Sequence, residues 1–335
     1  MTVHSSYLNS RAPLSTLVIG FSGGRGKLYA QCAAEHEGFR FDGVVKSRRE
    51  LDLTEFPIKP RVYENLTEAL QGPRKWDVAI VSVPHSAHDT ITRALIEVGV
   101  KLIIKEKPLA ISLEFAQEYS ALAERKGITM ITTTQRQIQP SFLKGLEMLS
   151  RIGEIHHFDY LYHFALPEVT SGWRGEKELA IGGVLLDMGY HALDMLHLYF
   201  GVMTEASGKL SYMHKEMAQQ ELEDKAEIEL TFGSAKGLLS IDRHALHRQE
   251  LFKIEGSEGT LEVRPTETIL YNKDGQEIER YTPPELDKLE QINLLFERSL
   301  APEHEEWRRT AFLRSVETVA AIEKIYKQTT IVPYE

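Results

Sequence analysis

Between residues 14 and 133 the sequence alternates short apolar runs with stretches of helical periodicity, and this alternation constrains the fold most strongly. Parallel strands need a crossover of a dozen or more residues, usually a helix. Strands covered on both faces read as continuous apolar runs. The alternation therefore predicts an α/β fold whose first half is a doubly wound, Rossmann-type parallel sheet. The predicted strands are 16–20, 41–45, 78–83, 102–105 and 129–133, and the predicted helices are 26–36, 65–71, 87–98 and 113–126.

From about residue 151 the pattern changes to longer segments with alternating polarity. Ala226, Ile228 and Leu230 share one face of a predicted strand, and charged residues occupy the other face. This pattern predicts a C-terminal α+β domain built on a large, mostly antiparallel open sheet. We expect a flexible tail at residues 1–14, a Rossmann domain at 15–135 and the α+β domain at 136–335.

Charge, cysteine content and hydropathy exclude several classes of protein. The chain has 335 residues, enough for about two domains at roughly 150 residues each. The net charge of −10 disfavours binding to a phosphate backbone. A lone cysteine, Cys32, permits neither a disulfide framework nor a thiolate zinc site within one chain. No segment has the apolar length of a membrane span or the core of a signal peptide. We therefore expect a cytoplasmic protein with no nucleic-acid or membrane partner.

A glycine-rich turn, residues 20–26, directly follows the first predicted strand. Glycines at that point let the backbone approach a pyrophosphate, whose charge the next helix N-terminus stabilises. In the spacing GxGxxG, Ser22 and Arg25 would replace two glycines, and a longer spacing through Gly20, Gly23 and Gly26 fits better. A plain flexible turn is the alternative, but the strand-to-helix setting favours a dinucleotide site. Its candidate cofactor residues are Gly20, Ser22, Gly23, Gly24, Arg25 and Gly26.

The second predicted strand ends in Lys46, Ser47 and Arg48, where an NAD-specific protein would usually have an acidic residue for the ribose hydroxyls. Polar and cationic groups suit a 2′-phosphate instead, so we expect NADP to be preferred over NAD. A solvated charged loop is the alternative. By position, the end of the predicted strand 78–83 adds further candidate cofactor residues: Ser82, Pro84, His85 and His88.

The run of residues 182–194 places an acid, an imidazole and a second acid at helical spacing. If a helix begins near its glycine pair, Asp187, His191 and Asp194 lie on one stripe and point into the same cleft. A carboxylate beside an imidazole fixes its tautomer and tunes its pKa toward neutrality. A metal site made of His191, Asp194 and His197 is the alternative, but the last histidine faces another part of the helix, so we predict no metal.

Three ordered signals carry a family resemblance: the glycine turn, Glu106-Lys107-Pro108 and the run 182–194. Over residues 16–332 the chain resembles the glucose-fructose oxidoreductase, inositol dehydrogenase and rhizopine-catabolism family, Gfo/Idh/MocA. The resemblance implies an NAD(P)-dependent oxidoreductase that acts on a sugar, sugar nucleotide, cyclitol or similar polyol. It also implies a homodimer or homotetramer assembled through the C-terminal sheet. Ser22 and Ile181 depart from the pattern, because many members have glycine there.

The resemblance also implies residue roles. Lys107 would contact the nicotinamide ribose and the reacting hydroxyl, and Asp187 and His191 would be the catalytic acid and imidazole. We expect His191 to exchange the substrate proton, with Tyr190 as an alternative donor and Asp194 as support. The further cofactor residues would be Glu106, Trp173 and Arg174. Two alternatives stay open: a redox-assisted glycosidase that retains its dinucleotide, and a non-catalytic dinucleotide-sensing regulator.

Overall fold

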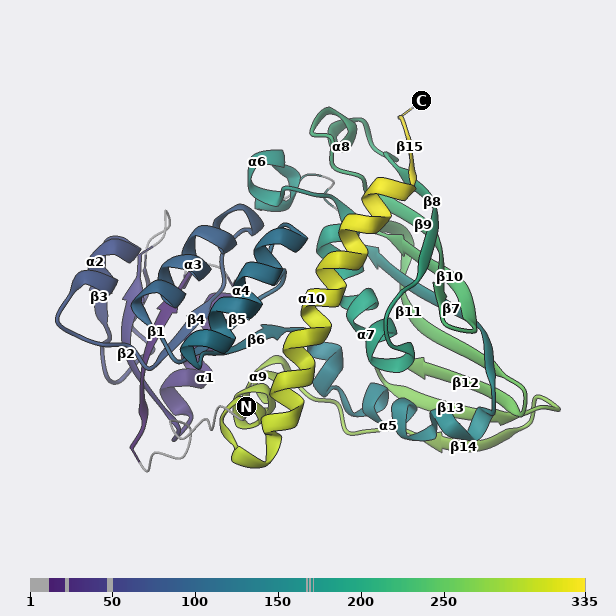
Figure 1. Ribbon diagram of the computed structural model, residues 1–335, viewed down its shortest axis with the longest axis horizontal. Coiled ribbons are helices and arrows are strands. Elements are labelled where there is room, and N and C mark those ends of the chain that lie inside the picture. Colours follow the sequence, from purple (N-terminus) through teal and green to yellow (C-terminus); the bar gives the residue numbers. More distant parts are fainter. Residues whose placement is uncertain are drawn as a thin grey trace. The chain divides into compact units, whose positions relative to one another are not determined.

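The computed structural model describes residues 12–21, 24–46, 51–166, 168, 170 and 172–334. The chain divides into two compact units, which Figure 1 colours along the sequence. Unit 1 comprises Met1–Thr133 and Leu286–Val316, and unit 2 comprises Thr134–Glu285 and Glu317–Glu335. The first boundary lies close to the predicted one at residue 135. Residues 286–316 belong to unit 1, whereas the prediction places them in a contiguous second domain. The ring of Phe296 in this segment packs 4.7 Å from the ring of Phe39.

Unit 1 is built on a six-stranded sheet in the order β3-β2-β1-β4-β5-β6, with every registered pair parallel. This confirms the predicted doubly wound sheet. A short strand, β3, is absent from the prediction, because three residues give no readable pattern. The strands are β1 (Leu14–Ile19), β2 (Phe39–Val45), β3 (Arg61–Tyr63), β4 (Val78–Val81), β5 (Leu102–Glu106) and β6 (Thr129–Thr133).

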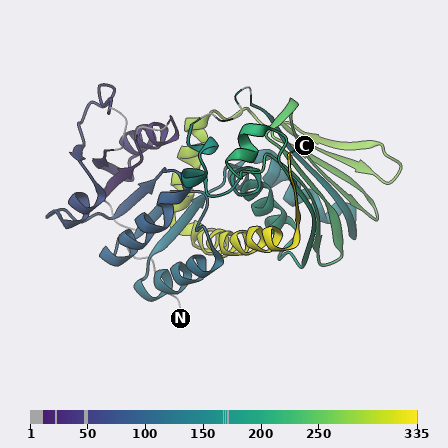
Figure 2. The same ribbon diagram turned by 90° about the horizontal axis from the view of Figure 1, so that it is seen from above.

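Helices cover both faces of the unit 1 sheet. Figure 2 shows α3 and α4 on one face and α1 with α9 on the other. The α4 helix begins as predicted, with the Ser112 side chain accepting from the Phe115 N–H. The helices are α1 (Gly24–Glu35), α2 (Leu66–Gln71), α3 (His88–Val98), α4 (Leu113–Lys126) and α9 (Lys288–Leu300).

Unit 2 carries a nine-stranded sheet in the order β14-β13-β12-β11-β7-β10-β9-β8-β15. Its parallel pairs are β7 with β10 and β8 with β15, and the other registered pairs are antiparallel, which confirms the predicted mostly antiparallel sheet. The strands are β7 (Ile155–Ala165), β8 (Glu205–Ser211), β9 (Lys225–Phe232), β10 (Ala235–Asp242), β11 (His244–Gly256), β12 (Gly259–Arg264), β13 (Glu267–Asn272), β14 (Glu277–Tyr281) and β15 (Thr330–Val332).

The helices of unit 2 include one that is unusually apolar. The stretch Lys177–Phe200 is long and apolar enough to span a membrane, which corrects the expectation that no segment is. Because 78% of its most apolar 18 residues are buried, the stretch forms part of the core of the unit. The helices are α5 (Pro140–Met148), α6 (Lys177–Ala180), α7 (Tyr190–Phe200), α8 (Lys215–Gln219) and α10 (Glu305–Gln328), which begins in unit 1 and ends in unit 2.

Candidate cofactor turn and proton-transfer residues

The glycine turn lies where the strand order of unit 1 reverses, between β1 and β4. Ligands of open α/β sheets bind beyond the carboxyl ends of the strands at such a point. Gly20 has φ +88°, and a Cβ there would collide with the Ser82 carbonyl at the end of β4. A Cβ on Gly26 would collide with the Gly20 carbonyl, so α1 packs tightly onto the turn.

Gly24, the first residue of α1, differs from these two glycines. Apart from Gly24, its two chain neighbours and the nearby backbone of α1, no heavy atom of the described residues lies within 4 Å of the position of its absent Cβ. The turn thus combines tight backbone packing with open space at a helix N-terminus, which fits the predicted binding of a pyrophosphate. Ser22 and Gly23, also predicted here, lie outside the described residues.

The end of β2 is described only as far as Lys46. Its backbone N–H donates to the Tyr63 carbonyl over 2.8 Å, and its half-exposed ammonium lies 3.2 Å from Glu64 Oε2. Ser47 and Arg48 lie outside the described residues. The preference for NADP therefore stays a prediction.

Glu106, the last residue of β5, links that strand to the helix after the glycine turn. Tyr29 Oη of α1 donates to Glu106 Oε1 over 2.7 Å, and Arg25 Nε lies 3.6 Å from the same oxygen. Burial raises the pKa of the Tyr29 phenol well above its usual value, so the phenol stays a donor. Two predicted cofactor residues, Arg25 and Glu106, are thereby brought together.

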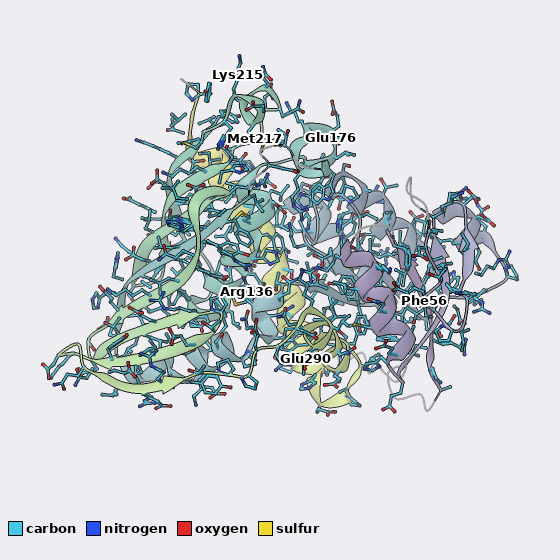
Figure 3. All side chains as sticks on the ribbon, turned by 180° about the vertical axis from the view of Figure 1, so that it is seen from behind. Phe56, Arg136, Glu176, Lys215, Met217 and Glu290 are labelled. Carbon is cyan, nitrogen blue, oxygen red and sulfur yellow. The ribbon has the colours of Figure 1, made fainter. Side chains whose placement is uncertain are left out.

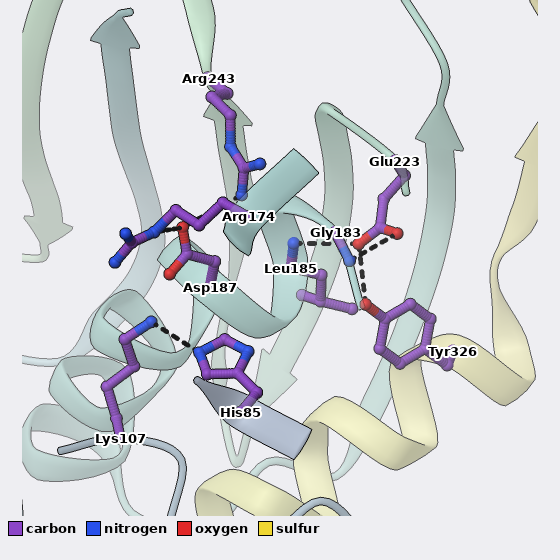
Figure 4. A network of polar contacts seen from close by, with 9 residues as sticks. All are labelled: His85, Lys107, Arg174, Gly183, Leu185, Asp187, Glu223, Arg243 and Tyr326. Carbon is purple, nitrogen blue, oxygen red and sulfur yellow. Dashed lines mark hydrogen bonds and ion pairs between the residues drawn. The ribbon is translucent and has the colours of Figure 1, made fainter. Parts of the chain in front are cut away.

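Lys107 lies just beyond β5 and is buried, with 6% of its surface exposed. Its Nζ is 3.3 Å from Nε2 of His85, which is likewise buried and begins the single turn His85–Ala87 after β4 (Figure 4). The Lys107–Pro108 peptide is cis. A buried lysine amine thus lies beside an imidazole at the carboxyl edge of the sheet.

His88 differs from its neighbour His85. Its ring is buried, its Nε2 lies 3.1 Å from the Val83 carbonyl oxygen, and burial holds its pKa well below the usual value. It is therefore a neutral core histidine at the start of α3. Pro84 precedes the turn His85–Ala87 and is partly exposed.

Lys105, inside β5, was not among the predicted site residues. Its Nζ donates to Thr92 Oγ1 over 2.8 Å and to the Leu109 carbonyl over 2.6 Å, so it closes the segment that carries Lys107. Burial lowers the pKa of the Lys105 amine to about 7. The sequence does contain one signal for it, a lysine inside an apolar run. Lysine is almost never buried unless it is paired, so such a residue indicates a buried partner.

In unit 2 the carboxylate of Asp187 is held by two arginines. Arg174 Nε donates to Asp187 Oδ2 over 2.9 Å, and Arg243 Nη2 donates to the same oxygen over 3.1 Å (Figure 4). Arg174 lies in the turn Gly172–Gly175, and its guanidinium stacks 4.4 Å from the ring centre of Trp173. Charge-assisted bonds of this kind fix the orientation of a carboxylate. Arg243 was not among the predicted residues.

The helix that carries Asp187, His191 and Asp194 is not a regular α-helix from the glycine pair onward, and the predicted single stripe of these residues stays a prediction. Residues Leu185–Gly189 form a π-helical turn, and α7 begins only at Tyr190. A π turn closes i→i+5 hydrogen bonds in place of the i→i+4 bonds of an α-helix. Asp187 accepts from the two arginines, whereas the buried Asp194 accepts from Thr134 Oγ1 over 2.6 Å.

The other residues of this helix have separate positions. His191 is the second residue of α7 and is partly buried, whereas Tyr190 is fully buried. His197 Nδ1 lies 2.9 Å from the Gly201 carbonyl oxygen at the end of the helix. Trp173 packs against a small apolar cluster of Ala180, Met217 and Leu222.

Glu223 fixes the start of the π-helical turn, and no feature of the sequence indicated it. Its carboxylate accepts from the backbone N–H groups of Gly183 and Leu185, each over 3.1 Å, and from Tyr326 Oη over 2.8 Å (Figure 4). A Cβ on Gly183 would collide with this glutamate, which accounts for one glycine of the pair. Glu223 thereby positions the segment that carries Asp187.

Comparison with known families gives two matches in the expected order. Residues 14–134 match the oxidoreductase family with an NAD-binding Rossmann fold, and residues 148–262 match the GFO/IDH/MocA C-terminal domain.

Curated relatives match over parts of their length. A myo-inositol dehydrogenase from Streptomyces leeuwenhoekii is 31% identical over 130 residues, 38% of this chain and 38% of that protein. A D-apiose dehydrogenase from Paraburkholderia graminis is 25% identical over 271 residues, 78% of this chain and 67% of that protein. The chain spans between 36% and 62% of the length of three other curated relatives that it matches.

Solved structures share the fold over nearly the whole chain. An NAD binding oxidoreductase from Klebsiella pneumoniae superposes with a TM-score of 0.80 at 20% identity, covering 95% of this chain and 96% of that one. A 3-ketoreductase from Actinomadura kijaniata, in complex with NADP and TDP-benzene, gives 0.79 at 18% identity, covering 96% and 100%. With both halves matched in order, the chain belongs to the Gfo/Idh/MocA oxidoreductase family, with an NAD-binding Rossmann fold.

Proposed function

We propose that this chain is an NADP-preferring oxidoreductase that acts on a hydroxyl or keto carbon of a sugar, sugar nucleotide, cyclitol or similar polyol. The observation that carries the proposal is Lys107, a buried lysine 3.3 Å from His85 at the carboxyl edge of a family-typical Rossmann sheet. Burying an ammonium is costly, so its presence there indicates a role in charge stabilisation. Relatives that are named dehydrogenases of inositol and apiose support the substrate class.

Each residue has one part in the proposed reaction. When bound, the nicotinamide supplies or accepts the hydride. Lys107 donates a hydrogen bond to the substrate oxygen and stabilises its developing negative charge. His191 removes the hydroxyl proton during oxidation and returns it during reduction. Asp187, fixed by Arg174 and Arg243, orients the substrate hydroxyl or the imidazole.

The test is turnover by His191→Ala and Lys107→Ala on a substrate found by screening sugars, cyclitols and sugar nucleotides. We expect kcat/KM to fall about 10²–10⁴-fold in each, the usual contribution of a positioned acid or base. His247→Ala removes an exposed histidine of β11 and should keep full activity. Full turnover in both catalytic variants would refute the mechanism. Dinucleotide binding without hydride transfer would favour a non-catalytic regulator. A cofactor that stays bound without net redox turnover would favour a redox-assisted glycosidase.

The cofactor preference has its own test. We expect tighter binding of NADPH than of NADH in calorimetry, and loss of most of that preference in Arg48→Asp, because a carboxylate repels the 2′-phosphate. Equal affinities in the unmodified protein would exclude the preference. We further propose a cytoplasmic homodimer or homotetramer, for which a monomeric mass by light scattering would be the contrary result.

A further inference from the structure

Two histidines and one aspartate from separate segments of unit 2 come together, and none of the three is among the residues proposed for proton transfer. His214 directly precedes α8, Asp224 directly precedes β9, and His244 is the first residue of β11. Figure 3 labels Lys215 and Met217 on α8, the helix that follows His214. The three residues each offer one ligand atom, and these atoms all lie within 4.8 Å of one another. The ring centres of the two histidines are 4.6 Å apart.

The backbone orients two of these side chains. The Asp224 side chain is fully buried, and its Oδ1 accepts from the Met213 N–H over 2.6 Å. Its Oδ2 lies 2.5 Å from His214 Nδ1. His244 Nδ1 lies 3.1 Å from the Leu166 carbonyl oxygen, which can only accept, so Nδ1 carries the proton. The other nitrogen, Nε2, is then the one with a free lone pair in the neutral ring.

That second nitrogen carries the strongest indication of a ligand. His244 Nε2 is buried and has no hydrogen-bond partner among the described residues. A buried polar atom without a partner is costly and calls for an explanation such as an ion. Metal-ligating histidines usually donate their other ring N–H to a carbonyl or carboxylate, which is the arrangement that His244 makes with Leu166.

We propose that His214, Asp224 and His244 bind a divalent transition-metal ion of the Zn²⁺ class. Two imidazoles and one carboxylate suit such ions, whereas Ca²⁺ and Mg²⁺ prefer oxygen ligands alone. Ligand atoms about 2.0–2.2 Å from a tetrahedral zinc lie roughly 3.4 Å apart, so separations of up to 4.8 Å must close by at most about 1.4 Å. His214 Nδ1 and Asp224 Oδ2, now 2.5 Å apart, must move apart if both bind the ion. The His214 side chain is 33% exposed and provides the entry path. Three protein ligands leave a position for water.

The ion would act as a clasp beside the segment that carries Asp187. The backbone already joins these parts, because the Arg243 N–H donates to the Asp224 carbonyl over 3.1 Å. Arg243 bonds to Asp187, and Glu223, adjacent to Asp224, holds the start of the π-helical turn. The clasp is therefore a positioning element, distinct from the residues proposed for proton transfer.

The test is Zn²⁺ binding by full-length protein after dialysis against a chelator. We expect one Zn²⁺ per chain in a competition titration, and binding at least about 10–100-fold weaker in His244→Ala and in His214→Asn. His247→Ala is the matched control, because it removes an exposed histidine from β11 and leaves the cluster intact. Co²⁺ should give visible d–d absorption in the unmodified protein and lose it in His244→Ala.

Two results would overturn the clasp. One is no Zn²⁺ binding by the unmodified protein, and the other is equal affinity in the His214→Asn variant. Circular dichroism of each variant without metal checks folding, and His214→Asn, at the more exposed end of the cluster, is the variant to rely on if His244→Ala does not fold. Because metal binding is the readout, the result does not depend on the proposed oxidoreductase activity.

Discussion

Replacing Lys105 by methionine tests whether a buried lysine supports the segment that carries Lys107. The pKa of the Lys105 amine is about 7 in the folded protein, lowered by burial from 10.5. Between those values the unfolded chain binds a proton that the folded chain does not. The free energy of unfolding therefore rises with pH across this window and levels off above 10.5. Below pH 7 both states are protonated, and the folded state bears the full cost of a buried ammonium.

The size of this effect follows from the pKa difference. A fall from 10.5 to about 7 is worth roughly 5 kcal/mol at 1.36 kcal/mol per pKa unit. Lys105→Met removes that pH dependence and the charge cost. The variant also leaves the Leu109 carbonyl without its donor, at a cost of about 1–3 kcal/mol at every pH. The difference in stability between the two proteins should thus change by several kcal/mol between pH 7 and pH 10.

Urea denaturation at pH 7, 8, 9 and 10, followed by circular dichroism and tryptophan fluorescence, measures this difference. Lys75→Met is the matched control: Lys75 is an exposed lysine of unit 1, and its profile should run parallel to that of the unmodified protein. A profile of Lys105→Met that parallels the unmodified protein would refute the reasoning. It would mean that the amine titrates at the same pH in the folded and unfolded chains.

Two further predictions concern the segment before Asp187. Ile181 has φ +67°, a strained conformation for a β-branched residue, and its side chain is exposed, so Ile181→Gly should raise the free energy of unfolding by about 1 kcal/mol in urea denaturation. Ile181→Ala keeps the Cβ and should bring no gain. Tyr326→Phe removes the 2.8 Å bond to buried Glu223 and should lower the free energy of unfolding by about 1.5–3 kcal/mol in the same assay, whereas no change would show that the bond is replaced by water.

The parallel sheet of unit 1 was predictable because its central strands are rich in apolar residues and helical stretches separate them. Residues of β1 and β4 are buried on both faces, and β4 together with the end of β1 therefore reads as a continuous apolar run. The three-residue strand β3 lies at the sheet edge with two exposed residues, and such a segment has no periodicity to read. Residues 286–316 join unit 1 through Phe296, a long-range contact that local patterns cannot reveal.

The candidate site was predictable only for residues that directly follow a predicted strand. Gly20 and Lys107 follow strands, so the sheet topology alone places them at its carboxyl edge. The partners of Asp187 lie 13 and 56 positions away in the chain. The residues of the π-helical turn show the same apolar pattern as an α-helix, so the sequence does not distinguish the two. Lys105 and Glu223 have roles set by what surrounds them in three dimensions.

Two pairs of adjacent residues link the proposed metal clasp to Asp187. In the pair Glu223 and Asp224, the first residue holds the π-helical turn and the second belongs to the cluster. In the pair Arg243 and His244, the first residue holds Asp187 and the second belongs to the cluster. A hydrogen bond between Arg243 and Asp224 joins the two backbones. Because packed interiors transmit small displacements, contraction of the cluster around an ion would move Arg243 and Glu223 together, so metal removal should alter turnover more than dinucleotide affinity.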